Sequence, residues 1–269
     1  KSIHDSGERL LQDGKRELML ATYGTGSFYG GGERGHKINL AGDTLVMYNK
    51  QNYGYVKGER RISQMNITMP LFLSSNGYAI LFDDYAAAEV ILGNPIKYIS
   101  ESPAPISYYY IYGDGTMKGL TEAVSQLTGR QDMPPFWAMG YITSKYGYKT
   151  EAETRSVIDT LKMNKYPVDG IVLDLYWYGK EQDMGRLAWE PQQWPDHKQM
   201  LADLKAKGVN TIIISQPYVL RNGRAIDNYN MGVEKGLFVK DATDSLKGTQ
   251  EVQIWVGEGG MFDVSNPDT

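Results

Sequence analysis

The chain has 269 residues, with 28 Lys and Arg, 32 Asp and Glu, three His, no Cys and 41% hydrophobic residues, a composition that excludes a fibrous or disordered protein. The formal net charge of -4 lacks the basic excess that binding to nucleic acid or to an anionic membrane surface requires. The absence of Cys excludes disulfides, thiolate catalysis and Cys-ligated zinc.

The first half of the chain predicts an antiparallel β-sandwich. Between residues 1 and 129, short stretches of alternating apolar residues are interrupted by Gly, Asn and Asp, which is typical of strands joined by turns. Residues 74–77, Ser-Ser-Asn-Gly, predict a hairpin turn between two of these strands. The clearest strands are expected at residues 17–22, 68–73, 78–82 and 106–112.

A helix is expected to end this first domain. Residues 116–128 carry apolar side chains close to helical spacing, and Gly129 stands where a C-cap belongs. The pair Pro134 and Pro135 then marks a boundary. We therefore expect one domain at residues 1–129, ending in a linker helix, and a second at residues 130–269. The apolar positions of the helix are Met117, Leu120, Val124 and Leu127.

The second half alternates apolar strands with amphipathic helices. Helices are expected at residues 150–163, which open close to a capping box, and near residues 197–207. Continuous apolar strands between helices indicate a parallel sheet covered on both faces, as in a doubly wound sheet or a (β/α)8 barrel. Residues 144–148 are aromatic rather than a Gly-rich phosphate loop, which favours the barrel. The strands are expected at residues 136–142, 170–176 and 211–215.

Asp174 is the first candidate for a functional residue. It ends an apolar strand and is followed by Leu-Tyr-Trp-Tyr. A buried, unpaired carboxylate costs on the order of several kcal/mol, so this one must be paired or open into a polar pocket. In a barrel the carboxyl ends of the strands carry the active site, and a carboxylate beside aromatic rings suits a sugar. The alternative is that Asp174 caps the next helix or pairs with a Lys.

Neither a metal nor a cofactor is expected. The three histidines His4, His36 and His197 are scattered, without the spacing of metal ligands. No apolar stretch approaches the roughly 18 residues that span a bilayer, so no membrane span is expected. The first residue is Lys, and any signal peptide is expected either to have been removed or to be absent from this sequence.

Seven short motifs occur in an order that is similar to glycoside hydrolase family 31, and together they cover nearly the whole chain. They lie at residues 29–34, 47–50, 53–55, 127–130, 134–140, 172–177 and 262–267. The Tyr-Asn-Lys of residues 48–50, followed by Tyr-Gly-Tyr, and the Asp-Leu-Tyr-Trp of residues 174–177 resemble the bacterial branch of α-glucosidases and oligosaccharide 4-α-glucosyltransferases.

The resemblance implies a β-sandwich domain followed by a (β/α)8 catalytic barrel. It also implies a retaining enzyme that hydrolyses α-glucosides, or transfers α-glucosyl units, through a covalent glycosyl-Asp intermediate. In such enzymes two carboxyl groups about 5 Å apart act as nucleophile and as acid and base. The alternatives are another α-glycosidase of the family, such as an α-xylosidase, and an inactive relative that only binds carbohydrate.

The chain departs from the family where the catalytic residues should stand. The nucleophile motif of the family, similar to Trp-x-Asp-x-x-Glu, does not occur here, and the part after Pro134 is about half of the roughly 250 residues of a complete barrel. We therefore expect about three barrel strands and no catalytic residue in this segment, with both carboxylates beyond Thr269. The remainder of the barrel is expected in the same polypeptide, or else in another chain. A periplasmic or secreted bacterial location is expected, with the cytoplasm as the alternative.

The substrate-binding half of the site is carried over by resemblance. Asp174 matches a family residue that binds hydroxyls of the sugar in subsite -1, which suits a carboxylate acceptor. Trp177 is expected to form a wall or platform, and Tyr146 is a similar candidate, although loop packing explains both equally well. Gln51 and Tyr53 lie in a segment that aligns with a loop at the rim of the active site.

An aromatic rim is expected to favour transfer over hydrolysis. The hypothesis is that Tyr53, Tyr55 and Tyr178 bind an acceptor glucose. Some family α-glucosidases have an acidic residue where Gln51 stands, so the acceptor subsites are expected to differ here. The expected partner is an oligosaccharide substrate.

Overall fold

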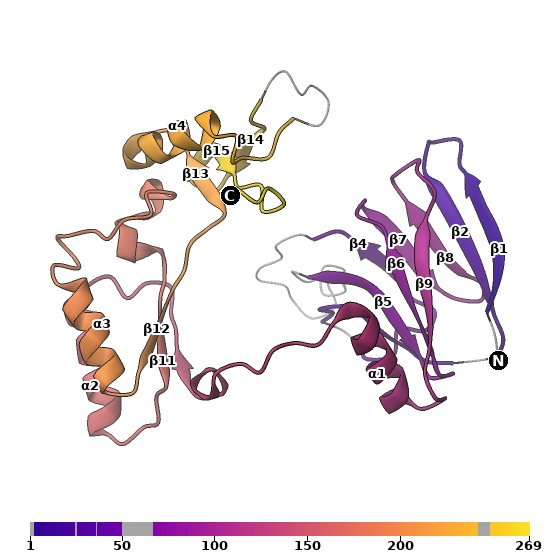
Figure 1. The fold of residues 1–269 in the computed structure, drawn as a ribbon, viewed down its shortest axis with the longest axis horizontal. Coiled ribbons are helices and arrows are strands. Elements are labelled where there is room, and N and C mark those ends of the chain that lie inside the picture. Colours follow the sequence, from indigo (N-terminus) through magenta and orange to yellow (C-terminus); the bar gives the residue numbers. More distant parts are fainter. Residues whose placement is uncertain (1–2, 25, 36, 50–66, 242–247) are drawn as a thin grey trace. The chain divides into compact units, whose positions relative to one another are not determined.

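The structure is a computed structural model that describes residues 3–24, 26–35, 37–49, 67–241 and 248–269. The chain divides into two units, Lys1–Asp132 and Met133–Thr269. Figure 1 shows the strand-rich first unit in indigo to magenta and the second unit from rose through orange to yellow. Among the described residues, no helix has both the length and the apolar character needed to cross a membrane.

The first unit is built from two antiparallel sheets, which confirms the predicted sandwich. One sheet has the order β1-β2-β8-β7-β4 and the other the order β3-β5-β6-β9. In the first sheet, the strands are β1 (Ile3–Leu10), β2 (Arg16–Thr22), β8 (Ile96–Ser100), β7 (Ala88–Leu92) and β4 (Thr44–Met47). In the second, they are β3 (Phe28–Gly32), β5 (Thr68–Ser74), β6 (Tyr78–Asp83) and β9 (Ser107–Tyr112).

Alternation along the strands creates the core between the two sheets. On β6, Tyr78, Ile80 and Phe82 are buried in a cluster that also includes residues of β2, β7 and β8. The rings of Phe82 and Tyr98 stack with their centroids 4.1 Å apart. Because side chains on a strand point to alternate faces, the apolar face of each sheet is covered by the other sheet.

Two local predictions in this unit are confirmed. The hairpin between β5 and β6 turns at residues 75–77, where Gly77 has a φ of +85° that favours glycine. The helix α1 (Met117–Thr128) begins after Thr116, whose hydroxyl accepts a hydrogen bond from the Gly119 amide at 3.0 Å. Leu120 of α1 packs with Ala79 of β6 in a second cluster, so the helix covers the other face of the β3-β5-β6-β9 sheet.

The second unit begins with a parallel three-stranded sheet of order β10-β11-β12. The strands are β10 (Ile142–Thr143), β11 (Gly170–Leu173) and β12 (Asn210–Ile213). They alternate with α2 (Glu151–Met163) and α3 (His197–Ala206), which places one helix in each connection. This β-α-β-α-β order is the start of a (β/α)8 barrel, and the predicted fold class is confirmed.

The predicted strand at residues 136–142 is wrong for most of its length. Phe136–Met139 forms a 3-10 helix, η2, and only Ile142 belongs to β10. Phe136 is 94% exposed, so this apolar stretch is not buried in the sheet. The preceding Pro135 is extended, at φ -62° and ψ 143°, and lacks the amide hydrogen that a central strand needs. β11 likewise ends at Leu173, because residues 175–178 turn into another 3-10 helix.

A small antiparallel sheet follows β12, and sequence reasoning did not predict it. It comprises β13 (Tyr218–Leu220), β15 (Gly257–Met261) and β14 (Glu251–Ile254), in that order. The segment between β13 and β14 holds the 3-10 helix η5 (Gly223–Ala225) and the helix α4 (Ile226–Glu234). A Cβ at Gly260 of β15 would lie 2.5 Å from the buried Phe238 ring, so this strand needs glycine. Its glycines are typical of a loop, which hides the strand.

Candidate functional site

Asp174 lies directly after β11, at the carboxyl end of the parallel sheet. Its Oδ1 accepts a hydrogen bond from the Leu175 amide at 2.7 Å, which caps the 3-10 helix η3 (Leu175–Tyr178). The cap considered as an alternative is therefore present. Within the described residues no hydrogen bond involves Oδ2 of this half-buried carboxyl group, so the geometry accommodates a cap and a ligand at once.

Tyr146 belongs to the loop after β10 and meets the loop after β11. Its hydroxyl donates to Oε1 of Glu181 at 2.6 Å, and the Tyr176 hydroxyl donates to the same oxygen at 3.0 Å. The two rings lie edge to face, with their centroids 5.9 Å apart. Glu181 begins the short 3-10 helix η4 (Glu181–Asp183). One carboxylate oxygen thus joins two loops that follow neighbouring strands.

Gly147 allows these loops to come together. Its φ of +88° is in the left-handed region, and a Cβ on this residue would collide with the Tyr176 ring. A side chain at this position would therefore be strained and would displace the ring. The Lys149 ammonium lies 4.8 Å from the centroid of the same ring.

The loop that carries Tyr146 is tied to α2 by Glu153. The Lys145 Nζ donates to its Oε1 at 2.6 Å, and the Lys149 amide donates to its Oε2 at 2.8 Å. These bonds, that from Lys145 first, hold the pKa of Glu153 below its usual value. The Glu153 amide in turn donates to the Thr150 hydroxyl, so the helix start predicted near Thr150 is confirmed.

Trp177, predicted as a wall or platform with loop packing as the alternative, is packed among other side chains, and its predicted role in binding stays a prediction. It is 4% exposed, and its indole nitrogen donates to the Ile214 carbonyl at 2.8 Å. Its ring lies 5.4 Å from that of Trp189, at 60°. Trp177 therefore joins the ends of β11 and β12 from within the core. The bond gives the buried indole N–H a partner, which favours this position of the side chain.

Tyr178 contradicts the predicted aromatic rim. It is 1% exposed, and burial, followed by the nearby Asp174 charge, raises the pKa of its phenol. Gln51 and Tyr53, together with Tyr55 of that rim, lie outside the described residues, and their predicted roles stay predictions. Of the predicted binding residues, Asp174 and Tyr146 have polar atoms at the carboxyl ends of the strands.

Sequence reasoning missed an ionic network that joins the connection between β11 and α3 to η5. Glu190 is 6% exposed, and its Oε2 lies 2.7 Å from Nη1 of Arg186 and 2.5 Å from Nη1 of Arg224. Arg224 also reaches Asp183, which is 2% exposed, at 3.3 Å. Beside this network lies a pocket of about 290 Å³ lined by Gly179, Lys180, Asp183, Glu190, Gln192, Gln193 and Arg224.

Only part of this network could be read from the sequence. The spacing of four residues between Arg186 and Glu190 is a recognisable ion-pair signal. Arg224 comes from η5, beyond two further strands, and no local pattern connects it to Glu190. Burial would raise the pKa of Glu190, but the hydrogen bonds from Arg224 and Arg186 outweigh it and leave the pKa below its usual value.

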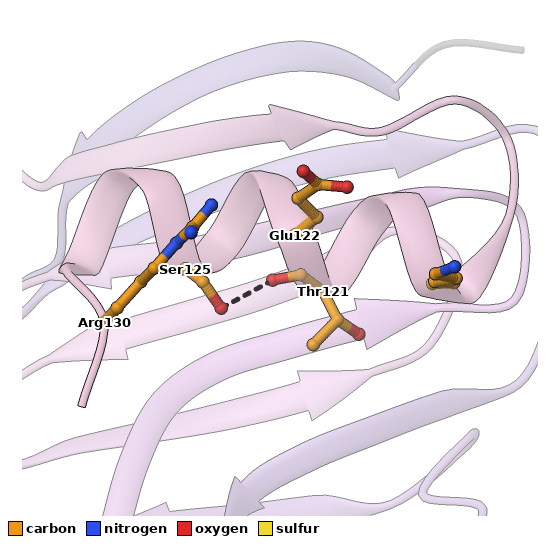
Figure 2. A pocket seen from close by; sticks show the side chains of 5 residues that line it. Thr121, Glu122, Ser125 and Arg130 are labelled. Atoms are coloured by element: carbon orange, nitrogen blue, oxygen red, sulfur yellow. Dashed lines mark hydrogen bonds between the residues drawn. The ribbon is translucent and has the colours of Figure 1, made fainter. Parts of the chain in front are cut away.

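A hollow on α1 in the first unit offers no comparable chemistry. Figure 2 shows its side chains, with the Ser125 hydroxyl donating to the Thr121 carbonyl within the same helix. The hollow has about 450 Å³ and is formed by Lys118, Thr121, Glu122, Ser125 and Arg130. Within the described part of the chain, no group of three or more His, Asp or Glu side chains has the arrangement to hold a metal ion.

Two family models match the chain. The model described as "Glycosyl hydrolases family 31 TIM-barrel domain" matches residues 131–269. The model described as "Glycosyl hydrolase 31 N-terminal galactose mutarotase-like domain" matches residues 9–90. The two matches fall on the two units of the structure, and the first covers more than half of the chain.

Curated relatives extend well beyond the length of this chain. Alpha-glucosidase 2 of Bacillus thermoamyloliquefaciens is 26% identical over 98% of this chain and 34% of its own length. The Alpha-xylosidase of Saccharolobus solfataricus is 30% identical over 76% of this chain and 28% of its own length. The 1,6-alpha-glucosyltransferase of Sporosarcina globispora is 25% identical over 85% of this chain and 18% of its own length. The chain thus spans about a third or less of these relatives.

Solved structures share the fold of both units. The Flavobacterium johnsoniae GH31 dextranase, complexed with glucose, matches with a TM-score of 0.86 and 24% identity, over 99% of this chain and 32% of that chain. A GH31 alpha-xylosidase from a soil metagenome, complexed with xylose, matches with a TM-score of 0.76 and 23% identity, over 97% of this chain and 36% of that chain. At these identities, the likeness shows the fold.

Proposed function

The chain belongs to glycoside hydrolase family 31, and we propose that it forms the substrate-binding half of a retaining enzyme that acts on α-glucosides or α-gluco-oligosaccharides. In this proposal the enzyme passes through a covalent glycosyl-Asp intermediate, which water or a second sugar then releases. Support comes from the relatives, which include an α-glucosidase and a glucosyltransferase.

The observation that carries the proposal is the position of Asp174. It lies at the carboxyl end of β11, where substrates bind in barrels of this kind. Its Oδ1 is occupied by the cap, while Oδ2 is available to accept hydrogen bonds from sugar hydroxyls. The exposed Tyr146 ring, after the neighbouring strand, adds an apolar surface of the kind that packs on sugar rings.

The chain's own residues are proposed to bind and orient, and the two reacting carboxyl groups to come from later barrel strands. One of these would attack the anomeric carbon while the other protonates the leaving oxygen. Neither role is assigned to a residue of this segment, because it lacks the family's nucleophile motif. The proposal therefore requires the remainder of the barrel, either from the same polypeptide, as we propose, or from another chain.

A second candidate activity is that of an α-xylosidase. It is favoured by the relative of that name in Saccharolobus solfataricus, which is 30% identical over 76% of this chain. Xylose lacks the hydroxymethyl group of glucose, so the two activities differ in the space and polar groups around that group. A pocket whose polar groups bind the hydroxymethyl group favours glucose, because xylose would leave those groups without partners. A pocket too small for the hydroxymethyl group favours xylose, because glucose would collide with its wall.

The test is incubation of the full-length gene product with maltotriose and, separately, with an α-xyloside, followed by separation of the products by size. Glucose and maltose alone are expected from hydrolysis, and products longer than maltotriose from glucosyl transfer. Release of xylose without action on maltotriose would replace the proposal by the second candidate. If the enzyme retains the nucleophile motif and acts on neither sugar, the proposed substrate class is wrong.

A further inference from the structure

Glu181 occupies an unusual position among the acidic residues after β11. A single oxygen of its carboxylate, Oε1, accepts hydrogen bonds from the hydroxyl groups of both Tyr146 and Tyr176. Tyr176 belongs to η3, directly after Asp174, whereas Tyr146 lies 35 residues before Glu181 in the loop after β10. The two phenols therefore share one anionic acceptor, and their bonds to it are charge-assisted.

This arrangement fixes a ring that would otherwise be free to move. Tyr146 is 60% exposed, so packing alone does not hold it. Its fixed points are the bond to Glu181, the edge contact with Tyr176 and the backbone of the loop that Glu153 ties to α2. The bond to Glu181 is the one that sets the orientation of the ring at its far end.

The Tyr146 phenol remains a hydrogen-bond donor over a wide range of pH. Hydrogen bonding to Glu181, followed by partial burial, raises the pKa of the Tyr146 phenol above its usual value of 10. The phenol therefore stays protonated and keeps donating throughout neutral and mildly alkaline solution.

We propose that Glu181 is a positioning residue that holds the Tyr146 ring at the carboxyl ends of β10 and β11, in the orientation that packs on a sugar of the substrate. The kinetic consequence rests on the proposed function, whereas the structural coupling between Glu181 and Tyr146 does not. Glu181 acts through Tyr146 and does not itself touch the sugar. The Tyr146 ring held in this way suits ligands with a ring face that a phenol can cover, namely pyranosides.

The proposal is tested in the full-length enzyme with the variants Glu181→Ala, Glu181→Gln, Tyr146→Phe and the double variant Glu181→Ala/Tyr146→Phe. Loss of a charge-assisted hydrogen bond in an exposed setting corresponds to about a threefold to tenfold change in binding. We therefore expect Glu181→Ala to raise KM for maltotriose by that factor with little change in kcat. Glu181→Gln keeps a side-chain oxygen as acceptor and is expected to restore KM to within about twofold.

The double variant separates positioning from a general effect on folding. With Tyr146→Phe already in place, removal of Glu181 is expected to raise KM by much less than it does in the wild type, because the bond is already lost. Glu234→Ala, an exposed acid at the end of α4, is the matched control and is expected to leave KM unchanged. Additive effects on KM, or no effect of Glu181→Ala, would overturn the proposal.

A second measurement distinguishes this proposal from the function on which its kinetics rest. The thermal midpoints of the same four variants report the coupling between Glu181 and Tyr146 without any substrate. A midpoint loss in the double variant that is clearly smaller than the sum of the single losses is expected. If the wild type acts on no sugar, the proposed function fails. The midpoint losses then decide the positioning role by themselves: a double-variant loss smaller than the sum of the single losses supports it, and an additive loss overturns it.

Discussion

At the scale of single residues, the site depends on groups whose partners are distant in the sequence. Asp174 and Tyr146 were predicted as substrate-binding residues from their motifs, and that role stays a prediction. Their environment was not predictable, because Glu181 is recognised as a partner of Tyr146 only when two loops meet. Trp177 shows the reverse case, since its aromatic character suggested a platform while its indole N–H bonds to Ile214 inside the core.

Gly147→Ala is expected to destabilise the second unit and to raise KM in the full-length enzyme. The new Cβ would meet the Tyr176 ring in addition to the strain of a φ of +88°, for a total of about 2 kcal/mol. Gly208→Ala is the control, because its φ of +73° is also strained but nothing lies within 4 Å of the added Cβ. Thermal unfolding of both variants checks this, and equal losses would show that the Tyr176 contact does not matter.

Glu190→Gln is expected to lower the free energy of unfolding at neutral pH and to make that free energy less dependent on pH in acid. In the wild type, the pKa of the Glu190 carboxylate lies below the usual 4.5. Its contribution to the stability of the fold is therefore present above pH 4.5 and is lost as the pH falls through the pKa of the folded state. Breaking this buried pair leaves Arg186 without its anion, at a cost of about 3 kcal/mol.

Thermal midpoints measured between pH 7 and pH 3 check this expectation. The difference between wild type and Glu190→Gln should shrink below pH 4.5, the usual value for this carboxyl group. Glu234→Gln is an exposed control whose midpoint should follow the wild type throughout. A difference that stays constant with pH would mean that the charge of Glu190 does not stabilise the fold.

At the scale of elements, periodicity was informative wherever one face of the element is buried. The alternation in β2 and the helical spacing in α1 both predicted elements that the structure contains. The stretch from Phe136 to Met139 was misread because apolar residues there are exposed rather than buried. β15 was missed because it is rich in glycine, although Gly260 is required by the close approach of Phe238 and Gly259 by that of the Val219 backbone.

Leu120→Ala is expected to loosen α1 from the sheet that it covers. Leu120 is fully buried, in a cluster with Ala79, Ile111 and Val124, and removal of its side chain creates a cavity at a cost of about 3 kcal/mol. Leu127→Ala on the same helix removes a side chain that is 46% exposed and should cost less than about 1 kcal/mol. Chemical denaturation measures both, and similar losses would mean that α1 does not depend on this contact.

At the scale of the whole molecule, each unit has a hydrophobic core of its own. The first unit has one core between its sheets and another beneath α1, and the second has one around β11 and one around β15. The second unit contains the beginning of a barrel, in which β12 pairs with β11 alone among the described strands. The proposed turnover therefore requires the complete barrel, while Asp174 and Tyr146 are the binding groups proposed within this chain.

Asp174→Asn and Asp174→Ala are expected to separate binding from folding in the full-length enzyme. Both remove the charge that is proposed to accept hydrogen bonds from sugar hydroxyls, and both should lower kcat/KM by about 100-fold. Only the Ala variant also loses the cap on η3, which should cost about 1 kcal/mol of stability. Kinetics on the accepted α-glucoside and thermal unfolding are the measurements, and a near-normal kcat/KM in either variant would remove Asp174 from the site.

The sequence by itself determined the class of fold, the family, and the alternation of strands and helices from β10 to β12. Alternation, helical spacing, the Thr116 and Thr150 caps and the ordered motifs are all written within short segments, and the physical preferences behind them act locally. Only the tertiary structure decided that Glu181 bonds to Tyr146 and that Arg224 pairs with Glu190. Those contacts join residues more than thirty positions apart, and the folded backbone alone brings them within reach.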